Sequence, residues 1–101
     1  MEELLDWLCH QNSSVRVFSQ FCEKALAVRA TEPQHAAMAR LLANLAGNFA
    51  EAYYGEPLTL DVANRALARL AEIVARAVRA NSAGPPQQME LLNEIGRIEL
   101  N

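Results

Sequence analysis

The chain has 101 residues, the size of one small domain, and its formal net charge is −3. Non-specific binding to nucleic acid or to an anionic membrane needs a basic surface, so this charge argues against both for the molecule as a whole. Hydrophobic residues make up 51% of the chain but aromatic residues only 6%, so much of the apolar content is alanine, the best helix former.

The first two predicted helices cover residues 2–10 and 14–29. Each has one apolar side, because large apolar residues recur three or four positions apart. In the polar stretch between them, Ser13 or Ser14 can accept a free backbone N–H at the start of the second helix. The first helix carries three acidic residues where a secretion signal would carry positive charge, so the sequence predicts no such signal.

The third predicted helix is long and covers residues 32–54. Its start signal consists of Thr31 as the cap, Pro33 in the first turn and Gln34, which can complete a capping box. Gly55 and a following proline end the helix, because glycine accepts the left-handed conformation and proline cannot continue a helix.

The last two predicted helices cover residues 60–80 and 86–98. Thr59 is placed to cap the first of them, and a stretch rich in Asn, Ser, Gly and Pro separates the two. No segment alternates like a strand, and no apolar run approaches the ~20 residues that cross a membrane. The sequence therefore predicts one all-α domain over residues 1–101. We expect a compact bundle of about five helices, two long (about 32–54 and 60–80) and three shorter.

Four arginines gather on one side of the predicted helix 60–80. At about 100° per residue they fall within an arc of roughly 80°, opposite a stripe of leucine and valine. Two apolar residues, Val62 and Ile73, flank this arc. Because arginine suits bidentate contact with carboxylates, the pattern predicts either a solvated helix face or a surface that docks an acidic protein partner. The candidate residues of that surface are Arg65, Arg69, Arg76, Arg79, Val62 and Ile73.

A lane of small residues follows one side of the predicted helix 32–54. Glycine inside a helix costs about 1 kcal/mol relative to alanine, so Gly47 indicates that another helix approaches closely there. That helix comes either from the same chain, with 60–80 as the candidate, or from a second copy or partner. The candidate residues of this close-packing or dimer lane are Ala36, Ala43, Gly47, Ala50 and Tyr54.

The sequence lacks the usual patterns of catalysis and metal binding. Neither His10 nor His35 has a second metal ligand three or four positions later in the chain, and Cys9 and Cys22 form no CxxC pair. No glycine-rich phosphate loop is present. We therefore expect no enzyme, no metal site and no cofactor. We also expect two free thiols in a reducing cytosol, with a disulfide between the first two helices as the alternative.

By elimination, the sequence predicts a small cytoplasmic protein–protein interaction module that acts through helix surfaces, as a regulator, adaptor, assembly factor or inhibitor. We expect a homodimer with a protein partner, no membrane association and no nucleic acid. Three alternatives stay open. The first is a nucleic-acid-associated regulator that uses the arginines of helix 60–80. The second is a small acidic inhibitor of the phage type, which blocks a host nucleic-acid-binding protein, and the third is a ligand-binding or catalytic helical bundle.

Overall fold

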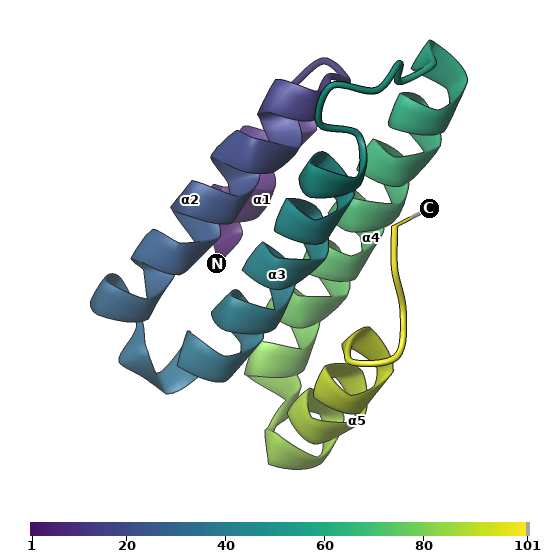
Figure 1. The fold of residues 1–101 in the computed structure, drawn as a ribbon. Helices are drawn as coiled ribbons and strands as arrows, with labels where there is room; N and C mark the ends of the chain where they lie inside the picture. The colour runs from purple at the N-terminus through teal and green to yellow at the C-terminus, as the bar shows by residue number, and fades with distance from the viewer. Residues whose placement is uncertain (101) are drawn as a thin grey trace.

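The computed structural model describes residues 1–100 and confirms the predicted all-α class (Figure 1). The helices, in chain order, are α1 (Glu2–Cys9), α2 (Val15–Thr31), the short 3-10 helix η1 (Pro33–His35), α3 (Ala36–Ala52), α4 (Leu60–Ala83) and α5 (Pro85–Ile95). The long helices α2, α3 and α4 run up and down the bundle, with α1 behind α2 in the view of Figure 1. The last helix, α5, packs on the C-terminal half of α4.

The third helix differs from its prediction at both ends. Residue 32 does not begin it; η1 comes first and α3 runs only from Ala36 to Ala52. Thr31 was expected to cap this helix, and this is wrong. Thr31 is the last residue of α2, and its hydroxyl donates to the carbonyl of Val28, 3.4 Å away. The outcome is three long helices instead of two, because α2 and α3 have 17 residues each and α4 has 24.

The predicted caps of α2 and α4 are present in the structure, and two glycines lie in turns between helices. Ser14 accepts a hydrogen bond from the Val17 amide at 3.3 Å and caps α2, and Thr59 does the same for α4 from the Val62 amide at 3.3 Å. After α3 the chain turns at Gly55, whose φ is 73°. Gly84 separates α4 from α5 with φ 119° and ψ 176°, a conformation open to glycine and hardly to any other residue.

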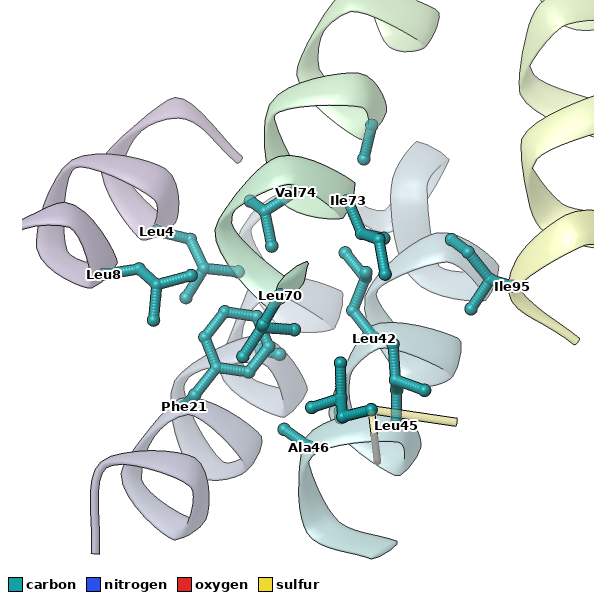
Figure 2. Close-up of a cluster of buried hydrophobic side chains, with 14 of the residues drawn as sticks. Leu4, Leu8, Phe21, Leu42, Leu45, Ala46, Leu70, Ile73, Val74 and Ile95 are labelled. Atoms are coloured by element: carbon teal, nitrogen blue, oxygen red, sulfur yellow. The ribbon is translucent and has the colours of Figure 1, made fainter. Parts of the chain in front are cut away.

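The buried apolar side chains form one continuous cluster between the helices (Figure 2). Its largest fully buried members are Phe18, Phe21, Phe49, Leu8, Leu42, Leu70 and Val74. The rings of Phe18 and Phe49 pack with centroids 4.5 Å apart, which joins α2 to α3. Within residues 1–100 no polar or charged residue is buried as a whole, although Nδ2 of the Asn81 side chain is buried without a hydrogen-bond partner among them.

The chain returns to the core after α5. The predicted helix 86–98 ends earlier, at Ile95, and residues 96–100 form a C-terminal segment without helical structure beyond a short turn. This segment runs back along the bundle beside α4 (Figure 1). Leu100 is only 5% exposed and belongs to the buried apolar cluster, and it lines two pockets, one with Leu45 and Phe49 of α3 and one with Val62 of α4. Leu100 therefore lies near both α3 and α4.

Candidate functional site

The arginine side of α4 is divided between two neighbours. Arg76 and Arg79, in the C-terminal half, line a shallow pocket of about 250 Å³ together with Gln87 and Glu90 of α5. The N-terminal half, which carries Arg65 and Arg69, faces the end of α3 and the C-terminal segment instead. The four arginines that the sequence places in one arc therefore belong to two different surroundings.

Arg76 is bound within the chain. Its Nη1 donates to Oε1 of Glu94 at 2.8 Å and its Nη2 donates to Oε2 at 2.6 Å, a bidentate pair between α4 and α5. This hydrogen bonding lowers the pKa of Glu94 below its ordinary value and raises the pKa of Arg76. Arg76 therefore ties α5 to α4 and already has an acidic partner in its own chain, while its docking of another protein stays a prediction.

The prediction that Ile73 docks a partner is wrong. The prediction placed it beside the arginines as an apolar anchor for a partner. In the structure Ile73 is 4% exposed and points into the same cluster as Leu42 and Ile95 (Figure 2). A helical wheel places Ile73 at the edge of the polar arc, and the arrival of α5 then covers it.

Val62 does lie at the surface, in what we call the docking pocket. This pocket has a volume of about 410 Å³ and is lined by Tyr53, Val62, Arg65, Arg69 and Leu100. Leu100 is buried, while Val62 and Tyr53 are half-buried and pack against the core. The ring of Tyr53 stands on Phe49 with centroids 4.9 Å apart, which holds it in place. The docking pocket thus combines apolar lining with two guanidinium groups.

The two arginines of the docking pocket are held only loosely by the rest of the chain. Arg65 Nη2 lies 3.8 Å from Oδ2 of Asp61, and these side chains are 75% and 90% exposed, a geometry that contributes little in water. Arg69 is exposed and forms no ion pair with any of residues 1–100. Both guanidinium groups therefore keep hydrogen-bond donors that a partner can use.

The small-residue lane of α3 is covered only in part by the rest of the chain, since Ala36 and Gly47 are half-buried. A side-chain carbon added at Gly47 would stand 3.2 Å from Sγ of Cys22, so α2 is the helix that approaches closely. The sequence suggested 60–80 for that role, which is wrong: the most extensive contact between helices is that of α2 with α3. Ala43 and Ala50 are buried on α3, while Tyr54, beyond its end, is 86% exposed. Burial raises the pKa of the Cys22 thiol, with a smaller effect from Glu23.

A second, acidic pocket of about 630 Å³ lies at the other end of α4. Glu2 and Glu3 of α1, Glu32 before η1 and Asn81 of α4 are among its lining residues. The Met1 amino group donates to Oε2 of Glu32 at 2.5 Å and so satisfies one of these carboxylates. Among residues 1–100, no group of three or more His, Cys, Asp and Glu side chains is arranged to hold a metal ion.

Sequence reasoning missed Glu94 and Leu100, the two residues that shape the surroundings of the arginines. Glu94 lies within a predicted helix but carries no signal that pairs it with Arg76, 18 positions earlier.

No helix of residues 1–100 is long and apolar enough to cross a membrane. No protein-family model, curated protein or solved structure matches this chain, so its function is inferred from the pockets themselves.

Proposed function

We propose that this protein is a small interaction module that binds another protein through the docking pocket, as a regulator, adaptor, assembly factor or inhibitor. One observation carries the proposal. Among residues 1–100, Arg69 has no ion-pair partner and Arg65 has only the exposed Asp61 at 3.8 Å, so both offer hydrogen-bond donors beside the apolar lining of the docking pocket. Interfaces between proteins favour this combination, because arginine and apolar or aromatic side chains supply most of their binding energy.

The surroundings of the docking pocket support the same proposal. Two of the most exposed large apolar side chains, Tyr54 at 86% and Leu60 at 69%, lie where α3 ends and α4 begins, the same end of the molecule as the docking pocket. A partner that covers the docking pocket has apolar surface to bury at its rim.

The test compares two double charge reversals in an affinity pull-down from the cells that make the protein. Arg65→Glu with Arg69→Glu changes the docking pocket, and Arg16→Glu with Arg40→Glu makes the same change of charge at exposed sites on α2 and α3. We expect a partner to be lost with the first variant and kept with the second, while circular dichroism and melting stay unchanged in both. A partner that both variants retain contradicts the proposal.

The acidic pocket supports a second candidate, the small acidic inhibitor of a nucleic-acid-binding protein. Three glutamates line it, and a basic target surface is the complement of such a group. Charge reversal of Glu2 and Glu3 would then abolish inhibition, whereas the Arg65 and Arg69 reversals would leave it intact. The nucleic-acid-associated alternative loses support, because Glu94 already neutralises one of the four arginines it would use.

The homodimer stays a prediction. The covering of Gly47 by Cys22 removes one reason for it, since the close approach is made within the chain. The exposure of Tyr54 leaves another in place. Light scattering at micromolar concentration tests it directly, and a monomer mass would show that the prediction is wrong.

A further inference from the structure

We propose that the docking pocket takes an acidic peptide segment in which a carboxylate side chain stands next to one bulky apolar anchor residue. This inference rests on the proposed function and names the class of partner. The ligand's carboxylate is recognised by Arg69, with Arg65 beside it, and its apolar side chain packs on Val62, Tyr53 and Leu100.

The charges determine the sign of the ligand. Arg69 has no ion-pair partner among residues 1–100, and the Asp61 carboxylate nearest Arg65 stands 3.8 Å away in an exposed position. Two guanidinium groups on one rim favour an anionic ligand, and the planar fork of arginine matches a carboxylate in bidentate geometry. A basic segment would place like charges together, and a neutral one would offer these donors only uncharged acceptors, which form weaker hydrogen bonds.

The size and lining of the docking pocket determine the anchor. Its volume of about 410 Å³ lies near the lower end of the roughly 300–1,000 Å³ that ligand sites span, enough for a single large side chain and its backbone. The lining is already formed, because Tyr53 stacks on Phe49 and Leu100 is buried. A preformed lining reduces the ordering cost of binding.

The chain itself supplies a precedent on the same helix. At the other end of the arginine arc, Glu94 binds Arg76 through both carboxylate oxygens, and the next residue, Ile95, is 3% exposed in the core. An acidic residue followed by an apolar anchor is therefore the pair that α5 presents to the C-terminal half of α4. The docking pocket offers Arg69 and an apolar lining in the N-terminal half, where α5 does not reach.

The experiment selects from a display library of random peptides on the immobilised full chain. Parallel selections use the wild type, the Arg65→Glu/Arg69→Glu variant and the Arg16→Glu/Arg40→Glu control. We expect the wild type and the control to enrich peptides with Asp or Glu beside a large apolar residue, and the docking-pocket variant to lose them. Synthetic versions then go into fluorescence anisotropy titrations. Replacing the carboxylates by amides, or the anchor by alanine, should each weaken binding about tenfold or more, and added salt should weaken it further.

The outcomes separate this inference from the proposed function. Neutral or basic peptides that still need Arg65 and Arg69 overturn the acidic class but keep the docking pocket as a binding surface. Peptides that bind the docking-pocket variant equally well, or no enrichment at all, count against both. A dimer in light scattering that the Arg65→Glu/Arg69→Glu variant dissociates assigns the docking pocket to a second copy of the chain and overturns the peptide proposal.

Discussion

The two halves of α4 carry similar residues in different surroundings. Val62, Arg65 and Arg69 in the N-terminal half correspond to Ile73, Arg76 and Arg79 in the C-terminal half, with the arginines four and three positions apart. In the C-terminal half, Arg76 meets the carboxylate of Glu94, and Ile73 is covered as α5 packs on the helix. In the N-terminal half, Arg69 has no acidic partner within residues 1–100, and Val62 stays half-exposed in the docking pocket. Arg76 thus joins two helices, whereas Arg69 has no ion-pair partner among residues 1–100. The exposed Arg79, in the C-terminal half, has none among these residues either.

The difference shows that an amphipathic pattern defines a face without defining what covers it. The arc is set by the helical repeat, whereas the cover depends on where α5 and the C-terminal segment return to the bundle. An arginine with a bidentate partner in its own chain contributes to the fold, and one without such a partner is available to another molecule.

The largest expected effect is that of Ile95→Ala, which tests whether α5 is held on α4 by apolar packing. Ile95 is 3% exposed, and removing so buried a side chain costs about 2–5 kcal/mol of unfolding free energy. Urea unfolding measures this cost. Ile98→Ala, at a half-buried isoleucine of the C-terminal segment, should cost clearly less. If the two variants lose the same free energy, α5 is not anchored where the structure places it.

Gly84→Ala should have the next largest effect, because Gly84 sets the direction in which α5 leaves α4. Its φ of 119° and ψ of 176° strain any residue with a side chain, at about 1–3 kcal/mol. Gly96 provides the control, since its φ of −63° suits alanine and a side-chain carbon there would stand 3.5 Å from the Leu92 carbonyl oxygen, an ordinary contact. Thermal melting should therefore separate the two variants. A Gly84→Ala protein as stable as Gly96→Ala would show that the turn relaxes without strain.

Glu94→Gln should have a smaller effect that depends on pH. The hydrogen bonds from Arg76 lower the pKa of Glu94 in the folded protein below its ordinary value of 4.5. A lowered pKa means that the pair stabilises the fold fully above pH 4.5 and that this contribution disappears as pH falls through the folded value. The wild type should therefore exceed Glu94→Gln in unfolding free energy at neutral pH and approach it in acid. Glu51→Gln, at an exposed carboxylate of α3, should show no such convergence.

The sequence predicts where the helices lie, but it does not predict which other parts of the chain cover their faces. Local chemistry marks several helix ends correctly: Ser14 and Thr59 cap α2 and α4, and Gly84 separates α4 from α5. Gly55 does not mark the end of α3, which stops at Ala52 with Tyr53 as its cap. Thr31 misled the prediction because a threonine hydroxyl can bond back to its own helix as well as cap the next one.

Ile73 and Val62 show where prediction of the candidate site stops. Both flank the arginine arc on a helical wheel, yet one is buried in the core and the other lines the docking pocket. Their difference depends on Ile95 and Leu100, which are distant in the sequence and reach α4 only through tertiary packing. Helical periodicity contains no information about such distant neighbours.

The smallest expected effect on stability is that of Arg69→Ala. Because Arg69 is exposed and pairs with no acidic group in residues 1–100, its removal should leave the unfolding free energy within about 0.5 kcal/mol of the wild type. Arg76→Ala removes both hydrogen bonds to Glu94 and should lower stability measurably in the same urea titration. Binding of an acidic peptide should respond in the opposite order. Arg69→Ala removes the guanidinium group that pairs with the peptide's carboxylate, whereas Arg76→Ala leaves it in place. If Arg69→Ala unfolds as easily as Arg76→Ala, then Arg69 also stabilises the fold and is not available to bind a partner.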